Sequence, residues 1–227
     1  MALTFFVTGT DTHVGKTFVT AALLRALNAE GLKTVGLKPL ASGCVWQEGA
    51  WQNDDALILQ QAASQFLPYA VINPIALIDP VAPHLAARKQ GQNLSLEKLV
   101  MALQPGLNVD ADVTLIEGAG GWYVPLNEQD YFSDLARVLS LPVILVVGIR
   151  LGCINHALLT VAAIEHAGVS LAGWVANCVD PSMDCREENI NCLRQKIAAP
   201  CLGVLPYFSA QDDVTAAAAH LHTHFVL

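Results

Sequence analysis

Residues 9–17 have the composition of a loop that binds phosphate groups. They read Gly-Thr-Asp-Thr-His-Val-Gly-Lys-Thr, after an apolar run and before a helical pattern. At such a junction, backbone N–H groups and the N-terminus of a helix face a phosphate chain. Lys16 can reach the β and γ phosphates of a nucleotide, and the Thr17 hydroxyl can bind Mg²⁺. The sequence therefore predicts a P-loop.

The first glycine of this loop stands one residue before its usual place. In the common pattern, G-x-x-x-x-G-K-[ST], it would occupy position 10, where this chain has Thr10 after Gly9. We therefore expect the loop to have its own geometry. A chance Gly-Lys-Thr is a poor alternative, because a strand pattern and a helix pattern flank it.

Glu117 ends the apolar run 113–117, and glycine-rich residues 118–121 follow at once. Its carboxylate should project from the carboxyl edge of a parallel sheet, where a P-loop also lies. There it can bind Mg²⁺ or one of the waters on it. The simpler alternative is a strand-end acid that only meets solvent.

Four polar residues from the end of the second expected strand to the start of the next helix have both a structural and a functional interpretation. Asp54 and Asp55 can cap the helix that follows them or bind a metal, and spacing does not choose between them. Lys38 follows a strand pattern, where lysine is more often solvated, although the phosphates are expected nearby. Ser42 lies in a loop of small residues and is more often a turn residue.

The rest of the chain predicts a scaffold that brings strand ends together. Apolar runs alternate with helical patterns, which is typical of parallel strands joined by helices, and the longest runs indicate strands covered on both faces. The expected strands are 3–8, 34–38, 113–117, 143–148, 171–177 and 201–205. The expected helices are 16–29, 54–64, 96–103, 155–167, 186–197 and 214–224. The proline-containing stretch between 64 and 96 is expected to be irregular.

Composition limits the class of protein. The chain has 227 residues, of which 53% are hydrophobic and 14% charged, so one globular domain over residues 1–227 is expected. A net charge of -8 counts against nucleic acid and acidic membranes as partners. Six cysteines without metal or disulfide spacing, and no signal-peptide or membrane-helix pattern, predict a cytoplasmic protein.

Together the motifs resemble those of the dethiobiotin synthetase family, along nearly the whole chain. They are Val-Thr-Gly-Thr-Asp-Thr (7–12), Val-Gly-Lys-Thr (14–17), Lys-Pro (38–39), Ala-Ser-Gly (41–43), Asn-Asp-Asp-Ala-Leu (53–57), Glu-Gly-Ala-Gly-Gly-Trp (117–122), Leu-Gly-Cys-Ile-Asn-His-Ala (151–157) and Gly-Trp-Val-Ala-Asn (173–177). The fold then expected is α/β, a mostly parallel sheet covered by helices on both faces in a single domain like those of P-loop NTPases.

The resemblance implies that 7,8-diaminononanoate, CO₂ and ATP react, with Mg²⁺ as cofactor, to give dethiobiotin, ADP and phosphate in biotin synthesis. The substrate amine captures CO₂ as a carbamate, whose oxygen attacks the γ-phosphate. The second amine then closes the ring on the resulting carbamic-phosphoric anhydride, with loss of phosphate.

It also implies a role for particular residues. The implied catalytic residues are Thr12, Lys16 and Lys38. The implied Mg²⁺ ligands are Thr17, Asp55 and Glu117, which favours Asp55 over Asp54. The implied ATP-binding residues are His13, Val14, Gly15, Lys16, Thr17, Phe18, Asp55, Glu117, Gly118, Ala119, Gly120, Asn177, Pro206, Tyr207 and Phe208.

Ser42 is implied to contact the substrate. The N–H groups of a helix start, at Gly152, Cys153, Ile154 and Asn155, are implied to receive the substrate carboxylate near the interface of a homodimer. The chain departs from the family at His13, where an acidic residue is common. The similarity also thins after Cys178, so that Tyr207, Phe208 and Asp213 are placed beside adenine by proximity alone.

Two alternatives remain open, and a third is disfavoured. A P-loop switch ATPase would use hydrolysis to change partner binding, and residues 177–180, Asn-Cys-Val-Asp, are similar to a guanine-reading Asn-Lys-x-Asp with cysteine in place of lysine. A paralogue would act on another diamine. An amidotransferase-type ligase of cobyrinic acid synthesis would need a glutaminase domain, for which the chain leaves no room.

The terminal histidines, His220, His222 and His224, do not share a helical face. They predict a frayed terminal helix rather than a metal site.

Overall fold

A computed structural model describes residues 3–209 and 214–226. The described residues form a six-stranded parallel sheet in the order β10-β9-β8-β1-β7-β2. Its strands are β1 (Leu3–Gly9), β2 (Thr34–Leu37), β7 (Val113–Glu117), β8 (Val143–Ile149), β9 (Leu171–Cys178) and β10 (Cys201–Leu205). Beside it, β3 (Leu40–Ser42) pairs in parallel with β6 (Ile75–Leu77), and β4 (Val45–Gln47) forms an antiparallel hairpin with β5 (Ala50–Gln52).

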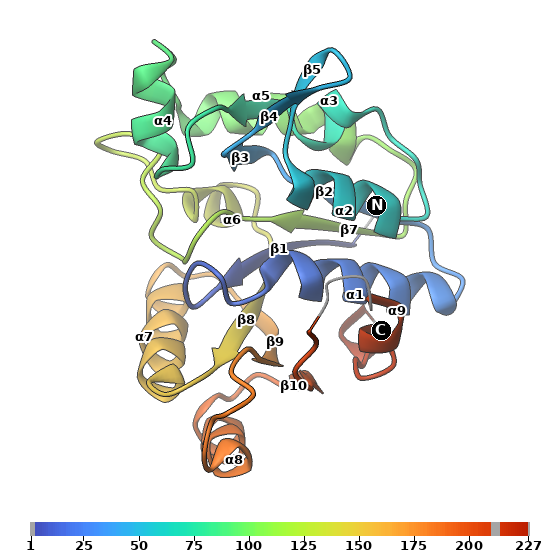
Figure 1. Cartoon of the computed structure of the whole chain (residues 1–227), viewed down its shortest axis with the longest axis vertical. Coiled ribbons are helices and arrows are strands. Elements are labelled where there is room, and N and C mark those ends of the chain that lie inside the picture. The colour runs from blue at the N-terminus through green and yellow to red at the C-terminus, as the bar shows by residue number, and fades with distance from the viewer. Residues whose placement is uncertain (1–2, 210–213, 227) are drawn as a thin grey trace.

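Helices cover both faces of this sheet (Figure 1). They are α1 (Lys16–Ala29), α2 (Asp54–Ala62), α3 (Tyr69–Ile72), α4 (Pro83–Lys89), α5 (Leu96–Leu107), α6 (Asp134–Val138), α7 (Cys153–His166), α8 (Arg186–Lys196) and α9 (Val214–Ala218), followed by a 3₁₀ helix (His224–Val226). Helices α2 and α9 contact α1, whereas α8 contacts α7 and α6 contacts α5. The predicted fold class is therefore confirmed. None of the described helices combines the length and the apolar character that crossing a membrane requires.

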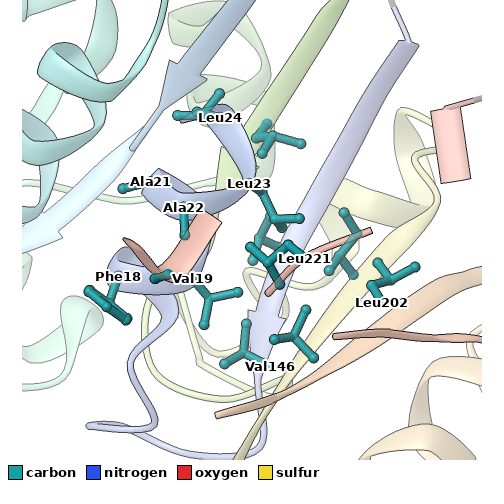
Figure 2. Packing of buried hydrophobic residues seen from close by; sticks show 14 of the residues in the cluster. Phe18, Val19, Ala21, Ala22, Leu23, Leu24, Val146, Leu202 and Leu221 are labelled. Carbon is teal, nitrogen blue, oxygen red and sulfur yellow. The ribbon is translucent and has the colours of Figure 1, made fainter. Parts of the chain in front are cut away.

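Alternation along the central strands explains why their sequences read as unbroken apolar runs. In β8, Ile144 and Val146 belong to the core on the α1 side, while Leu145 and Val147 face the core beneath α7 and α8. Successive side chains of a strand point to opposite faces, so a strand between two helical layers needs apolar residues at every position. Figure 2 shows Val146 among the α1 side chains.

The strand order brings the predicted chemistry to one edge of the sheet. Strand β1, which leads into the P-loop, pairs with β7 so that Val7 lies opposite Glu117. Strand β2, which leads to Lys38, pairs with the other side of β7. Because all these strands run the same way, their carboxyl ends are neighbours, and the loops that follow them form one site.

The structure differs from prediction at the C-terminal end of the chain. The helix predicted over 214–224 ends at Ala218, and the remaining prediction was wrong. Instead, the N–H of His222 donates to Leu202 O at 2.7 Å, and Leu221 bridges Gly203. This path inserts Leu221 into the core, and Phe225 reaches Phe5 with ring centroids 5.1 Å apart, so apolar burial wins over local helix propensity.

The proline-containing stretch was also more ordered than predicted. It holds α3, β6 and α4, and α5 runs past its predicted end at Leu103, through Pro105, to Leu107. The hairpin β4–β5 was not predicted. Its exposed Trp46 and Trp51 pack edge to face with ring centroids 5.5 Å apart, whereas Trp122 and Trp174 are buried core residues.

Candidate active site

The P-loop leads into α1 at position 15, where only glycine fits without strain. Gly15 caps α1 in the left-handed conformation, with φ of 80°. A Cβ at this position would lie 2.2 Å from Nδ2 of Asn177. That nitrogen is itself held, because it donates to Val14 O at 2.9 Å. Asn177, near the end of β9, thus supports the P-loop.

Lys16 is folded back into the loop that contains it. Its side chain is buried, and Nζ donates to Asp11 O at 3.0 Å. Burial lowers the pKa of Lys16 to about 8; the carboxylate of Glu117 opposes this shift and the charge of Lys38 adds to it. The carboxylate of Asp11 accepts a hydrogen bond from Arg150 at 2.6 Å, which ties the loop to the end of β8.

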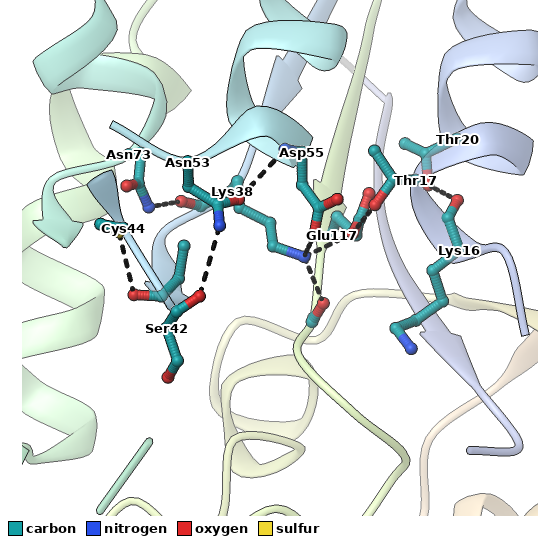
Figure 3. A network of polar contacts seen from close by, with 12 residues as sticks. Lys16, Thr17, Thr20, Lys38, Ser42, Cys44, Asn53, Asp55, Asn73 and Glu117 are labelled. Carbon is teal, nitrogen blue, oxygen red and sulfur yellow. Dashed lines mark hydrogen bonds and ion pairs between the residues drawn. The ribbon is translucent and has the colours of Figure 1, made fainter. Parts of the chain in front are cut away.

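Lys38 is buried at the centre of a cluster of charges, in which Glu117 is also buried and Asp55 is partly exposed (Figure 3). Its Nζ lies 2.5 Å from Glu117 Oε1 and 3.3 Å from Asp55 Oδ2, and it donates to Gly118 O at 3.2 Å. Burial alone would lower the pKa of Lys38, but the carboxylates of Glu117 and Asp55 outweigh it, and the pKa is raised. Lys38 therefore keeps its positive charge at neutral pH.

Thr17, Glu117 and Asp55 fit a Mg²⁺ site. The Thr17 hydroxyl donates to Glu117 Oε1 at 2.8 Å, and the fully buried Glu117 has a second oxygen, Oε2, without a hydrogen-bond partner among the described residues. A buried carboxylate oxygen left in this way is unfavourable unless a cation binds it. Oxygen donors suit Mg²⁺, which takes few protein ligands and completes its shell with phosphate oxygens and water. The described residues contain no group of three or more His, Cys, Asp or Glu placed to hold a metal.

A pocket of about 670 Å³ brings most predicted residues together. The predicted residues that line it are Thr12, His13, Gly15, Lys16, Thr17, Phe18, Lys38, Ser42, Asp55, Glu117, Ala119 and Gly120. Residues 80–83 form a further part of the wall. The buried Oγ of Ser42 has no hydrogen-bond partner in the described chain, so this hydroxyl is available to a ligand.

A smaller pocket, of about 260 Å³, shares Gly15 and Phe18 with the first. Asn177, Tyr207 and Phe208 line it, and Phe208 packs on Phe18 with ring centroids 5.2 Å apart. Apolar rings beside the P-loop suit a flat base. Val14, Gly118 and Pro206 are not among the lining residues described for either pocket, and Asp213 lies outside the described residues.

The turn predicted to receive a carboxylate opens α7, as expected, with Gly152 as its N-cap at φ of 93°. Gly152 and Asn155 are exposed, Ile154 is half-buried and Cys153 is buried. Within the described chain, these four residues are not part of the lining of either pocket. Their role stays a prediction.

Sequence reasoning missed the residues that support the side of the pocket at Lys38 and Asp55. The N-cap of α2 is Asn53, whose side chain accepts from the N–H of Asp55 at 3.1 Å, so the cap interpretation of Asp54 and Asp55 was wrong. Both aspartates are first-turn residues, and Asp55 is free to face Lys38. Asparagine directly before a helical pattern was the signal that identifies such a cap. Tyr69 and Asn73 connect Asn53 with the backbone of Lys38 by hydrogen bonds, and neither carried a comparable signal in the sequence.

Comparisons with known proteins agree with this geometry. A family model described as an AAA domain matches residues 3–215. ATP-dependent dethiobiotin synthetase BioD of Cellvibrio japonicus is 52% identical over 96% of this chain and 94% of its own, and that of Pseudomonas aeruginosa is 52% identical over 96% and 95%. That of Xanthomonas oryzae pv. oryzae is 51% identical over 94% of each chain.

Among solved structures, the fold is similar to that of a septum site-determining protein, MinD, and of a cell division ATPase, also MinD. For MinD of Pyrococcus horikoshii complexed with Mg-ADP, the TM-score is 0.57 at 16% identity, over 94% of this chain and 86% of that one. For MinD of Pyrococcus furiosus, the TM-score is 0.56 at 20% identity, over 96% and 89%. These likenesses concern the fold, whereas the sequence relatives share half of their residues over almost their full length. The chain therefore belongs to the ATP-dependent dethiobiotin synthetase family.

Proposed function

We propose that the whole chain, residues 1–227, acts as one synthetase domain that converts 7,8-diaminononanoate, CO₂ and ATP into dethiobiotin, ADP and phosphate. The observation that carries the proposal is the protonated, buried Lys38 in a pocket that also contains the P-loop and the free hydroxyl of Ser42. A phosphoryl acceptor bound between them would meet two lysines and the γ-phosphate at once. The names of the relatives support the same reaction.

Each step needs charge to be offset rather than a covalent bond to the protein. An amine of the substrate forms an N–C bond to CO₂ and loses a proton, which leaves a carbamate beside Lys38. The carbamate oxygen attacks the γ-phosphorus while the bond to the ADP oxygen breaks, and Lys16 and Lys38 offset the negative charge shared in that transition state. The second amine attacks the carbamoyl carbon, loses a proton and expels phosphate.

Other pocket residues orient the reactants. The hydroxyl of Ser42 can bind an amine or carbamate, and Thr12 lies where it can bond either the carbamate or the γ-phosphate. Thr17, Asp55 and Glu117 would hold Mg²⁺, which neutralises phosphate charge when bound. The pocket at Asn177, Tyr207 and Phe208 would take adenine. Holding reactants in line in this way supplies much of the rate enhancement.

The predicted carboxylate site is proposed to work in a homodimer. Neither pocket is lined by the residues of this turn, which are Gly152, Cys153, Ile154 and Asn155. A substrate that binds in the larger pocket and reaches the turn must therefore extend beyond the pocket. Leu151 beside this turn is 91% exposed and Leu159 on α7 is 63% exposed, which favours contact with a second copy. A subunit interface at α7 would cover both leucines and place the turn near the substrate.

The reaction is proposed to take place in the cytoplasm, with neither nucleic acid nor a membrane as partner. All six cysteines lie in the described ranges and are free thiols, as is usual in a reducing compartment. The net charge of -8 disfavours polyanions.

Incubation of the purified protein with diaminononanoate, bicarbonate, Mg²⁺ and ATP tests the proposal. We expect a cyclic urea with the mass of dethiobiotin, and no product when ATP or Mg²⁺ is left out. ATP hydrolysis that yields no urea and is stimulated by another protein would favour the switch alternative instead. Turnover of a different diamine alone would identify a paralogue.

ATP binding is expected to weaken as the pH rises through about 8, the pKa of Lys16 in the free protein. Phosphate bound to Lys16 favours its charged form and raises its pKa. Affinity should therefore be constant below this pH, fall above it, and be accompanied there by proton uptake. Calorimetry in two buffers of different ionisation enthalpy measures both effects. Lys16→Arg keeps its charge throughout, and an equal fall in that variant would contradict the assignment.

A further inference from the structure

Three residues of the proposed site are joined by hydrogen bonds that run through Asn53, which lines the pocket, and through two residues that do not. Lys38 follows β2, Ser42 ends β3 and Asp55 lies in the first turn of α2. Tyr69 and Asn73, at the two ends of the short helix α3, connect them, although neither residue is part of the pocket lining described above. The segment that contains both was expected to be irregular.

The backbone of Lys38 is held on both sides by the end of α3. Its N–H donates to Ile72 O at 2.9 Å. Its carbonyl accepts from Nδ2 of Asn73 at 2.6 Å, a contact visible in Figure 3. Asn73 is only 3% exposed, so water does not compete freely for either bond. The point from which the Lys38 side chain leaves the backbone is therefore fixed by Asn73.

The hydroxyl of Tyr69 links this clamp to α2. It donates to Oδ1 of Asn73 at 2.9 Å and accepts from the N–H of Asn53 at 2.8 Å. Tyr69 opens α3 and Asn73 caps its end, a spacing of one helical turn that puts both on one face. Burial raises the pKa of Tyr69 to about 12, so the hydroxyl keeps the proton that it donates.

Asn53 carries the connection to the other two residues. Its Oδ1 accepts from the N–H of Asp55 at 3.1 Å, and its Nδ2 donates to Ser42 O at 3.3 Å. Figure 3 shows Asn53 between Ser42 and Asp55. One phenolic oxygen thus connects the backbone of Lys38, through Asn73, to those of Ser42 and Asp55, through Asn53.

We infer that Tyr69 and Asn73 are positioning residues for the half of the site that binds the carbamate, and that they set the relative placement of Lys38, Ser42 and Asp55. The inference rests on the proposed function for its kinetic test. The P-loop is carried by β1 and α1, and the hydrogen bonds of this network do not include it. Loss of the network should therefore disturb turnover far more than nucleotide binding, which it can weaken only through the proposed Mg²⁺ ligand Asp55.

Tyr69→Phe removes the hydroxyl and keeps the ring. We expect kcat to fall about 10- to 100-fold, because a shift of about 1 Å in a group that contacts the reacting atoms has effects of this size. The KM for ATP should change far less than kcat, because the network includes Asp55 but neither the P-loop nor the other proposed Mg²⁺ ligands, Thr17 and Glu117. Tyr131→Phe is the matched control, since the Tyr131 hydroxyl makes no hydrogen bond to the described residues and is partly exposed; its kcat should stay at the wild-type value.

Asn73→Ala and the double variant complete a cycle. If both residues act through one connection, the double variant should be only about as slow as the slower single variant. Fully multiplicative effects, or a kcat of Tyr69→Phe within about twofold of wild type, would overturn the inference. So would an equal loss of ATP affinity, which indicates general loosening of the fold.

Hydrogen exchange separates failure of this inference from failure of the proposed function, because it needs no substrate. In Tyr69→Phe, peptides containing Asn53 and Asp55 and peptides containing Lys38 and Ser42 should both exchange faster than in wild type and in Tyr131→Phe. If only the peptide with Asn53 changes, Tyr69 is a local support and the inference is wrong. If exchange changes in both but the wild type forms no urea, the network stands and the proposed reaction fails.

Discussion

Replacing Lys38 with methionine is expected to reduce kcat by about 10²- to 10³-fold, the loss seen when one preorganised charge-stabilising donor is removed from an active site. ATP affinity should change far less, because the phosphates would be held by the backbone of the P-loop and by Lys16. The reason lies in the position of the ammonium group, which is buried between Glu117 and Asp55 and faces the pocket beside Ser42. Its charge should stabilise the carbamate and the transferring phosphoryl group more than the bound nucleotide.

Steady-state kinetics and calorimetric ATP binding measure the two effects separately. Lys33→Met is the matched control, since Lys33 stands just before β2 as Lys38 stands just after it, but is exposed and paired with Asp110 at 2.7 Å. It should retain wild-type turnover. Thermal unfolding tests whether the protein stays folded when Glu117 loses its ion pair with Lys38 and keeps the hydrogen bond from Thr17. Wild-type turnover in a folded Lys38→Met protein would exclude the proposed role.

Gly15→Ala is expected to weaken ATP binding by about 100-fold. The left-handed conformation is unfavourable for alanine by roughly 1–2 kcal/mol, and displacement of Asn177 forfeits a hydrogen bond worth about 1 kcal/mol. In the free protein the loop can relax away from this strain, so ATP must restore it on binding. The sum of about 2–3 kcal/mol corresponds to roughly 30- to 150-fold in affinity.

Gly31→Ala separates the backbone strain from the close contact. Gly31 lies just beyond the other end of α1 and has a similar φ, of 83°, but a Cβ there would meet nothing within 4 Å. This variant should lose about 1 kcal/mol in the free energy of unfolding and bind ATP normally. Calorimetric titration with ATP decides the comparison, and normal binding by Gly15→Ala would show that the P-loop does not depend on the fit between Gly15 and Asn177.

The sheet and the nucleotide side of the site could be predicted because their signals are local. A strand buried on both faces is apolar throughout, as in Val143–Ile149, and the Gly-Lys-Thr of the P-loop is adjacent in sequence to the strand and helix that position it. Glu117 was placed for the same reason, at the end of a recognisable strand. In each case the residue and the element that orients it lie within a few positions of each other.

The support for Lys38 could not be predicted in this way. Asn73 holds a carbonyl 35 residues earlier in the chain, and Tyr69 bonds to Asn53 across 16 residues. Their helix, α3, has four residues, too short for a periodic pattern. Spacing alone did not choose between Asp54 and Asp55. The family resemblance favoured Asp55, and the structure places Asp55 at 3.3 Å from Lys38, behind a cap at Asn53.

The four tryptophans offer two separate fluorescence signals within one chain. Trp46 and Trp51 protrude from the β4–β5 hairpin, which lies between Ser42 and Asn53, two residues joined by a hydrogen bond, while Trp122 and Trp174 are buried in the core. Emission from the hairpin pair lies toward the red and is open to quenching by iodide, whereas emission from the core pair is shielded until the protein unfolds. Replacing the hairpin pair with phenylalanine leaves a probe of folding alone. Replacing the core pair leaves a reporter beside the proposed substrate pocket.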